Sequence, residues 1–350
     1  MKAGMLQQIL GERRYRIGAC LGQGSLGRVF ACEDRTRPGV PLALKMVRPD
    51  VMSPAAADTL RHEFRVLARL EHPGIVKVHD FGKLPGRAEL FFTEDLVDGA
   101  PFTKRLNRAP IEIILRCFAK VLRAVGFIHA RSVLHCDLKP RNVLIERTEE
   151  GRLRVRLLDF HLCRLGDSIR DGAIRGTVAY MAPEVIRGET VDRRADLYGL
   201  GAMLYETLAR RLPFTGRTAH EQLRAHLEQQ PGSLCELRGD VSRDLDRLVQ
   251  RLMAKQPADR FSSAREVLRA LHDIDPGCLV ETEPTRQAYL RAGALVGRDS
   301  ELALMRRAVG VVTGRRRTSS RRRARLASLL SNWRFPVVTD GNITQSCHDN

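Results

Sequence analysis

The chain has 350 residues, 43% of them hydrophobic, which is ordinary for a globular protein and enough for one large domain or two average ones. Its formal net charge of +18 is unevenly placed, because residues 315–325 (RRRTSSRRRAR) hold seven arginines. Such a run is typical of a solvated tail, and docking on nucleic acid through it is the weaker alternative. We therefore do not expect nucleic acid to be a main partner.

The sequence also argues against secretion, membrane insertion and zinc binding. Its eight cysteines are scattered, without C-x-x-C pairs or zinc-ligand spacing, which favours reduced thiols in a cytosol. The N-terminal residues MKAGMLQQILGERRY lack the apolar core of a signal peptide. The longest apolar stretch, 111–130, is interrupted by Arg116, Lys120 and Arg123, which predicts an amphipathic helix instead of a membrane span. We expect a cytoplasmic protein.

The first hundred residues are rich in strand patterns. Short runs bounded by turn residues predict strands over 15–24, 27–34, 41–47, 75–82 and 89–97. Residues 59–70 carry Leu60, Phe64, Leu67 and Leu70 at helical spacing and predict one helix. This part is expected to form a β-rich lobe with a single helix.

Helical patterns dominate the next part of the chain. They cover 111–130, 195–211, 218–229, 242–254 and 262–274. A small β-rich lobe followed by a larger helical lobe favours an α+β fold with a cleft between the two. From Asp275 the pattern loosens, so we place a boundary there.

A glycine-rich loop lies between the first two strands, with Gly22, Gly24 and Gly27 in the pattern G-x-G-x-x-G-x-V. Glycines let the backbone approach phosphate oxygens without a Cβ in the way. A dinucleotide-binding version of this motif needs a helix directly after it, whereas a strand is predicted here. Alone, the motif is as consistent with a structural turn as with a phosphate site.

A lysine is predicted on the third strand. Period-2 alternation places Ala43 and Lys45 on one face, and a lysine on the inner face needs an anionic partner. Glu63, one turn before Leu67 on the predicted helix, is a candidate. A solvated edge lysine and a surface glutamate are the alternatives.

The densest group of functional side chains is the segment His135-Cys-Asp-Leu-Lys-Pro-Arg-Asn142, followed by Asp159. Asp137 can orient a hydroxyl and accept its proton. Lys139 can neutralise a transferring phosphoryl group. Asn142 and Asp159 offer hard oxygen ligands that suit Mg²⁺. The combination, more than any single residue, indicates phosphoryl transfer.

These motifs together resemble the protein kinase family, most closely the serine/threonine branch found in bacteria. The resemblance covers about residues 15–274 and keeps the family order: the glycine loop 22–29, Lys45, Glu63, HCDLKPRN at 135–142, Asp-Phe at 159–160 and GTVAYMAPE at 176–184. It implies a two-lobed α+β kinase fold. Residues 1–14 would form an N-terminal extension, 275–290 a linker and 291–350 a tail.

The resemblance implies an ATP site. Gly22, Gly24 and Gly27 would cover the phosphates, and Lys45 would hold the α- and β-phosphates while pairing with Glu63. Four side chains would sandwich adenine: Leu21, Val29, Ala43 and Leu144. Asp95 to Val97 would form the hinge between the lobes. Glu94, just before it, is unusual where the family mostly has an apolar or Thr side chain.

It also implies the catalytic roles. Asp137 would act as the base, Lys139 would steady the γ-phosphate, and Asn142 with Asp159 would bind Mg²⁺. The pairing of Lys139 with Thr177 resembles serine/threonine specificity. Asp196 would brace the catalytic loop. Glu184 would pair with Arg260 to fix the substrate-side loop. These residues and Thr177 complete the expected site.

Two residues depart from the family pattern. His161 stands where the family has the Gly of Asp-Phe-Gly, and a side chain at the positive φ expected there would cost about 1 kcal/mol. Because Asp159 is kept, we expect a stiffer magnesium loop and not an absent one. A pseudokinase that binds nucleotide with little or no transfer is the main alternative, motivated by His161 and Glu94; a small-molecule kinase is opposed by the segment 176–184.

Cys136 stands where many members have an Arg that binds an activation-loop phosphate, and Cys cannot pair with phosphate as Arg does. The segment from Asp159 to Glu184 offers only Ser168 and Thr177 as hydroxyls. We therefore expect that activation-loop phosphorylation is not the switch. A small buried Cys136 is favoured over a redox sensor.

The tail carries LVGRDSEL (295–302), which resembles the start of an NTPase module in large bacterial signalling proteins. Residues 310–320 (GVVTGRRRTSS) lack the Lys-Ser/Thr that such a module needs to cradle phosphates. We expect a truncated, poorly ordered tail.

Overall fold

The computed structural model describes residues 14–24, 27–48, 53–84, 89–165, 168–169, 177–279, 285 and 287–288. By its internal contacts the chain divides into Met1–Ala294 and Leu295–Asn350, and the described residues all belong to the first unit. The predictions for the extension before Arg14, for the tail 291–350 and for its NTPase-like start lie outside these residues.

The N-terminal lobe is built on a five-stranded antiparallel sheet with the order β1-β2-β3-β5-β4. Its strands are β1 Tyr15–Gln23, β2 Gly27–Asp34, β3 Pro41–Val47, β4 Val78–Lys83 and β5 Leu90–Asp95. The predicted run 41–47 matches β3 residue for residue, because turn residues bound a mostly apolar run on both sides. All five predicted strands are present.

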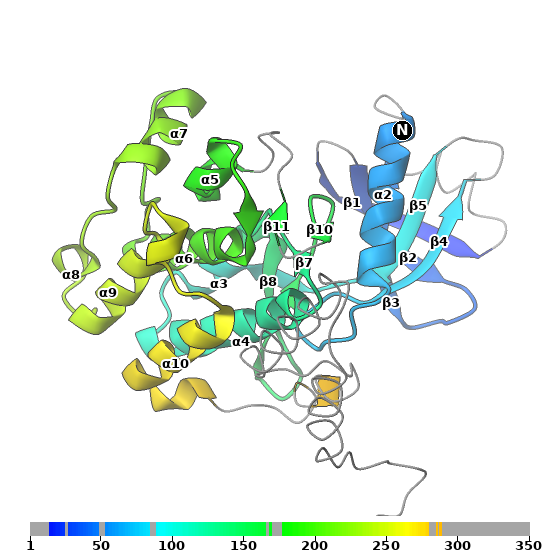
Figure 1. Cartoon of the computed structure of the whole chain (residues 1–350). Helices are drawn as coiled ribbons and strands as arrows, with labels where there is room; N and C mark the ends of the chain where they lie inside the picture. The colour runs from blue at the N-terminus through cyan, green and yellow to red at the C-terminus, as the bar shows by residue number, and fades with distance from the viewer. Residues whose placement is uncertain are drawn as a thin grey trace, which may run out of the picture. The chain divides into compact units, whose positions relative to one another are not determined.

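Helix α2, Pro54–Leu67, lies along this sheet (Figure 1) and buries Leu60, Val66 and Leu67. It begins earlier than predicted, because the side chain of Ser53 accepts a hydrogen bond from the Ala56 N–H and Pro54 occupies the first turn. It ends before Leu70. The inward face of α2 also carries Glu63, which is buried.

The C-terminal lobe is helical. Its helices are α3 Phe102–Leu106, α4 Ile111–His129, α5 Pro183–Ile186, α6 Arg193–Ala209, α7 Ala219–Glu228, α8 Leu234–Leu237, α9 Arg243–Leu252 and α10 Ala264–Ile274. Helix α6 is buried on nearly all sides, and an added Cβ at Gly201 would lie only 2.7 Å from the Leu252 side chain of α9. The long helices were predicted; α3, α5 and α8 are too short to show a period.

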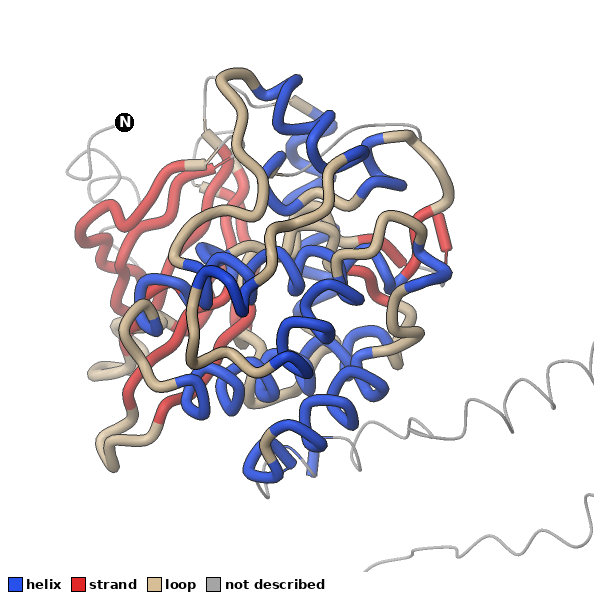
Figure 2. Tube along the Cα trace, turned by 90° about the vertical axis from the view of Figure 1, so that its left-hand side faces the viewer, coloured by secondary structure: helices blue, strands red, loops and turns tan. Residues whose placement is uncertain are grey.

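Short strands surround the segment His135–Asn142. The hairpin β8 Val143–Arg147 and β9 Leu153–Leu157 joins β6 Gly99–Pro101 in one sheet. The other pairs are β7 Val133–Leu134 with β10 Arg164–Leu165 and β11 Ser168–Ile169 with β12 Val191–Asp192. None of these was predicted, because runs of two to five residues carry almost no periodicity. Figure 2 shows the large sheet on the left and most of the helices to its right, so the expected two-lobed α+β class is confirmed.

The lobes are joined beside the hinge. Val76 N–H donates to the Leu157 carbonyl at 3.0 Å, and Leu157 N–H donates to the Gly74 carbonyl at 2.8 Å. Arg156 on β9 forms an ion pair with the carboxylate of Asp95, at the end of β5. Strand β9 is therefore attached both to the segment between α2 and β4 and to the end of β5.

Across the part of the chain that the structure describes, every helix is too short or too polar to span a bilayer.

Glu184 and Arg260 form a buried ion pair in the C-terminal lobe. The two guanidinium nitrogens Nη1 and Nη2 each donate to one carboxylate oxygen of Glu184 at 2.7 Å, and both side chains are at most 2% exposed. Arg260 Nη1 also donates to the Arg194 carbonyl at 3.0 Å, which links the pair to α6. The pairing expected from the resemblance is present.

Replacing Glu184 by Ala should lower the free energy of unfolding by about 3–5 kcal/mol, because it leaves the Arg260 charge buried and unpaired. Urea unfolding of the two proteins measures this. Glu228→Ala is the matched control: it breaks the exposed pair with Arg224 and should change stability by less than about 0.5 kcal/mol. Equal losses in the two variants would contradict the importance of burial.

Candidate active site

Lys45 joins three elements at the bottom of the N-terminal lobe. From β3 its Nζ lies 2.6 Å from Oε1 of Glu63 on α2 and 2.6 Å from Oδ1 of Asp159. Burial alone would lower the pKa of Lys45, but the two carboxylates outweigh it and raise the pKa above its ordinary value. The ammonium is thus charged and held in place, and the structure brings together the pair Lys45–Glu63 named from sequence.

Asp159 is positioned by the residue that follows it. Phe160 is completely buried, and its backbone N–H donates to Oε1 of Glu63 at 3.1 Å. Its ring contacts that of His135 in a tilted arrangement, with the ring centroids 4.6 Å apart. The Asp159 carboxylate is thereby directed toward Lys45. Burial would raise its pKa, but Lys45 and the bond from His161 hold that pKa below its ordinary value.

The expectation that His161 takes a positive φ is wrong. Positive φ occurs instead at Asp159, with φ of 63°, and at Cys136, also 63°. The conformational cost of a positive φ, expected at His161, therefore arises at Asp159. Aspartate is one of the residue types that tolerate the left-handed region. His161 Nδ1 lies 2.7 Å from Oδ1 of Asp159, so the substituted residue contacts the predicted metal ligand directly.

Asp137 is fixed by its neighbours in the segment His135–Asn142, called the catalytic segment below. The Asn142 side-chain amide donates to the Asp137 carbonyl at 2.8 Å and to its Oδ2 at 3.0 Å. Lys139 Nζ lies 2.6 Å from the same Oδ2. With its nitrogen used in this way, Asn142 keeps its carbonyl oxygen as a possible cation ligand beside Asp159.

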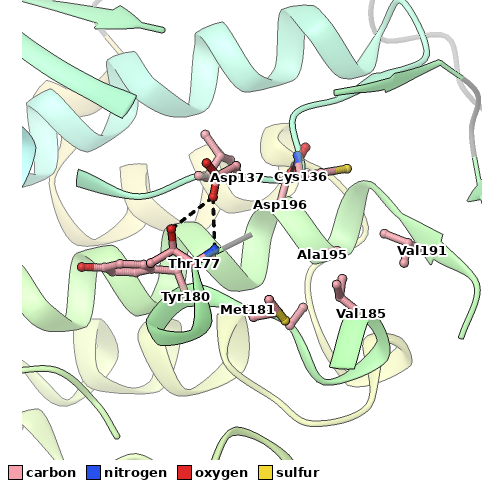
Figure 3. A pocket seen from close by; sticks show the side chains of 12 residues that line it. Cys136, Asp137, Thr177, Tyr180, Met181, Val185, Val191, Ala195 and Asp196 are labelled. Atoms are coloured by element: carbon pink, nitrogen blue, oxygen red, sulfur yellow. Dashed lines mark hydrogen bonds between the residues drawn. The ribbon is translucent and has the colours of Figure 1, made fainter. Parts of the chain in front are cut away.

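Thr177 closes the other side of Asp137. Its N–H and its hydroxyl approach Oδ1 of Asp137 at 3.3 and 3.4 Å, the two dashed lines of Figure 3. Lys139 Nζ donates to the Thr177 hydroxyl at 2.8 Å. Segment 177–180 is thereby joined to the catalytic segment through the carboxylate expected to be the base.

Asp196, in the first turn of α6, holds the backbone of the catalytic segment. Its two oxygens accept the backbone N–H groups of His135 and Cys136, both at 2.9 Å, and His129 Nε2 lies 2.7 Å from Oδ2. Burial favours the neutral acid, yet the His129 contact and these donors keep the pKa of Asp196 below its ordinary value. The anchored N–H of Cys136 accounts for its positive φ.

His135 was noticed in the sequence without a role. It is completely buried, and burial lowers its pKa, so the ring is neutral. Nε2 lies 3.1 Å from the Leu158 carbonyl, and Nδ1 accepts the Asp137 N–H at 3.4 Å. His135 thus links the catalytic segment to the segment of Asp159. The sequence feature that indicates this buried role is the position of His135 among apolar residues.

Cys136 is half-buried, not buried as expected. It lines a pocket with Met181, Val185, Val191 and Ala195, below the catalytic segment (Figure 3). Asp137 and Asp196 also line this pocket, and no Lys or Arg of the described residues does, so the position where family members carry Arg has acidic and apolar surroundings.

The glycine loop leaves space beside Gly22 and Gly24. An added Cβ at either would meet no atom within 4 Å, whereas at Gly27 it would lie 2.7 Å from the Met46 carbonyl oxygen. The Gly24 N–H donates to the Gly27 carbonyl at 2.9 Å and closes the hairpin. Gly27 is thus required by packing on β3, while Gly22 and Gly24 leave room for a ligand.

The residues expected around adenine come from both lobes. Ala43 is buried, Val29, Leu144 and Val97 are half-buried, and Leu21 is 51% exposed. At the hinge the Asp95 side chain faces His79, 2.8 Å away, and Arg156, so only its backbone is available to a nucleotide. Within the described residues, the Val97 N–H donates no hydrogen bond. The contact of these residues with adenine stays a prediction.

Glu94 is a buried acid next to this site. It lies opposite Ala43 in the β3–β5 register and is 6% exposed. Burial raises its pKa to about 8, although Lys45 acts in the opposite direction. The residue that looked unusual in the sequence therefore keeps its proton to a higher pH than an exposed glutamate does.

Replacing Glu94 by Gln should remove a pH dependence of stability. The folded chain keeps a proton at Glu94 that the unfolded chain loses above pH 4.5, so the resulting stability is complete below that pH and lost as the pH rises to about 8. Between about pH 6 and about pH 8.5 the wild type should lose about 2 kcal/mol more than Glu94→Gln in urea unfolding. Equal losses would mean that Glu94 is ionised in the folded protein.

Comparison with known proteins agrees with this geometry. The model of the protein kinase domain matches residues 15–271, most of the chain. The chain is 32% identical over 275 residues to serine/threonine-protein kinase pkn3 of Myxococcus xanthus. The matched region covers 75% of this chain and 50% of the relative.

Two further relatives are similar to the same degree. Serine/threonine-protein kinase PknB of Mycolicibacterium smegmatis is 32% identical over 279 residues, 75% of this chain and 43% of its own length. Serine/threonine-protein kinase PknJ of Mycobacterium tuberculosis is 34% identical over 272 residues, which are 73% of this chain and 44% of the length of PknJ. The chain spans half or less of the length of these relatives. On its matched domain and its site, the chain belongs to the protein kinase family.

Proposed function

We propose that the chain is an ATP- and Mg²⁺-dependent serine/threonine protein kinase of bacterial signalling. The observation that carries the proposal is the bridge from Lys45 to both Glu63 and Asp159, with Asp137 held nearby by Lys139, Asn142 and Thr177. Phosphoryl transfer needs alignment and charge neutralisation more than covalent chemistry, and these groups supply both.

Each residue has a role in this scheme. Lys45 binds the α- and β-phosphates, and the oxygens of Asn142 and Asp159 fit a hard divalent cation. The cation, when bound, neutralises charge on the phosphates. Asp137 orients the acceptor hydroxyl and takes its proton, while Lys139 lies 2.6 Å from that carboxylate and can neutralise the transferring group.

Serine or threonine residues of proteins are the proposed acceptors. Support comes from the names of the relatives and from the bond between Lys139 and Thr177. The alternative of a small-molecule kinase has less support, because the segment that ends in Glu184 is braced by Arg260 as a fixed surface beside Asp137.

A pseudokinase is the second candidate, and Glu94 and His161 favour it. A buried acid lies in the β3–β5 register beside the lysine, and a histidine contacts Asp159. Against it stand the ion pairs of Lys45 and the intact surroundings of Asp137, which a chain without transfer would not need.

Asp137→Asn should lower phosphate transfer from labelled ATP and Mg²⁺ to a generic protein acceptor by about 10²–10⁴-fold, because it removes the base while keeping the shape of the side chain. Asp58→Asn, at an exposed position of α2, is the control and should leave transfer unchanged. Wild-type transfer no greater than that of Asp137→Asn would favour the pseudokinase.

We also propose that activation-loop phosphorylation does not control the enzyme. Among the described residues no Lys or Arg lines the pocket of Cys136, so it offers no cation for a phosphate. The backbone of Ser168 pairs with Asp192 of β12, and its side chain lies outside the described residues.

Ser168→Ala should therefore keep transfer within about twofold of wild type in the labelled-ATP assay, because no phosphate on this residue is needed. Cys136→Arg is the matched variant that restores the arginine, and in this background transfer should depend on Ser168. A loss of activity in Ser168→Ala comparable to that in Asp137→Asn would contradict the proposal.

The cytoplasmic location and the domain boundaries at 14, 274 and 290 stay predictions.

A further inference from the structure

Three side chains near the catalytic segment bring ligand atoms to one point. Asp137, Asp159 and His161 each offer one such atom, and all three atoms lie within 4.8 Å of one another. Ligands on opposite sides of an octahedral ion are about 4.2 Å apart for bonds of about 2.1 Å. A small movement of side chains would therefore place Asp159 and His161 on one cation, with Asp137, the proposed base, beside it.

The closest two atoms already have the spacing of neighbouring ligands. His161 Nδ1 and Asp159 Oδ1 are 2.7 Å apart, whereas adjacent ligands with bonds of about 2.1 Å at right angles lie about 3 Å apart. In the absence of an ion the two atoms form a hydrogen bond, and a bound cation can take the place of that bond.

The site is also anchored from outside. Lys45 contacts Oδ1 of Asp159 at 2.6 Å, and Oδ2 accepts no hydrogen bond from any described residue. The His161 side chain is 17% exposed and Asp159 32%, so solvent reaches both. A cation can therefore reach the Asp159 carboxylate, where Oδ2 can serve as the ligand beside His161 Nδ1 while Oδ1 keeps its ion pair with Lys45.

We propose that His161 is a nitrogen ligand of the active-site cation and shifts the preference of this site from Mg²⁺ toward Mn²⁺. The inference rests on the proposed function, because it concerns the cation of that reaction. Mg²⁺ favours all-oxygen surroundings, whereas imidazole nitrogen suits transition metals. A glycine at this position offers no side-chain ligand, so the departure from the family pattern adds a donor where the family has none.

The opposite effect would follow if His161 acted only as a cation itself. An imidazolium paired with Asp159 would compete with any metal, so its removal would strengthen binding of Mn²⁺ and Mg²⁺ alike. The two possibilities therefore predict changes of opposite sign in the same measurement.

The test uses the full chain with MnCl₂ and no nucleotide. Electron paramagnetic resonance of free Mn²⁺ gives its affinity, competition by MgCl₂ gives that of Mg²⁺, and electron spin echo envelope modulation detects a directly bound nitrogen. His161→Asn keeps a polar side chain but removes the nitrogen ligand. His220→Asn, at an exposed position of α7, is the matched control.

In wild type and His220→Asn we expect nitrogen coupling to bound Mn²⁺. In His161→Asn the coupling should vanish and Mn²⁺ affinity should fall about tenfold or more, while Mg²⁺ affinity changes less than about threefold. Absence of nitrogen coupling in the wild type, equal losses for the two metals, or tighter Mn²⁺ binding by the variant would each overturn the inference.

Phosphate transfer measured on the same samples separates the two proposals. Transfer above that of Asp137→Asn without nitrogen coupling would reject the ligand role of His161 and keep the kinase. Nitrogen coupling without such transfer would keep the cation site and reject the proposed function.

Discussion

The ammonium of Lys45, whose side chain is only 14% exposed, is the constraint on which the site depends. A charge removed from water at this depth is tolerated only with partners of opposite sign, and it finds two, Glu63 and Asp159. These carboxylates come from α2 and from the segment after β9, so one requirement fixes the helix against the sheet and the segment of Asp159 below both. The same oxygen of Glu63 accepts the Phe160 N–H, which joins the backbone of that segment to the same point.

The catalytic segment depends on a second buried charge. Asp196 accepts two consecutive backbone N–H groups and so holds Cys136 in a left-handed conformation that costs about 1–2 kcal/mol. Asp137 follows directly, and its carboxylate is then set by Asn142, Lys139 and Thr177. The two departures from the family pattern have different consequences. Cys136 changes the pocket below the segment, whereas His161 contacts the carboxylate that would hold the metal.

Much of the fold could be predicted where a local signal was strong. Turn residues on both sides defined β3, and a long amphipathic period defined α4 within one residue. The beginning of α2 was missed because its signal is the Ser53-Pro54 cap and not its apolar period. The short strands around the catalytic segment were missed because two residues have no period; they exist through pairing with residues distant in sequence, as Ser168 does with Asp192.

The sequence by itself determined which residues form the candidate site, because the order and spacing of Lys45, Asp137, Asn142 and Asp159 are properties of the chain. Only the tertiary structure decided how the backbone and the charges are arranged. It placed the positive φ at Asp159 instead of His161, since the Phe160 N–H and the Asp159 carboxylate must both reach partners in the N-terminal lobe. It also raised the pKa of Glu94, because the pKa of an acid depends on its burial and its neighbours, which no local pattern records.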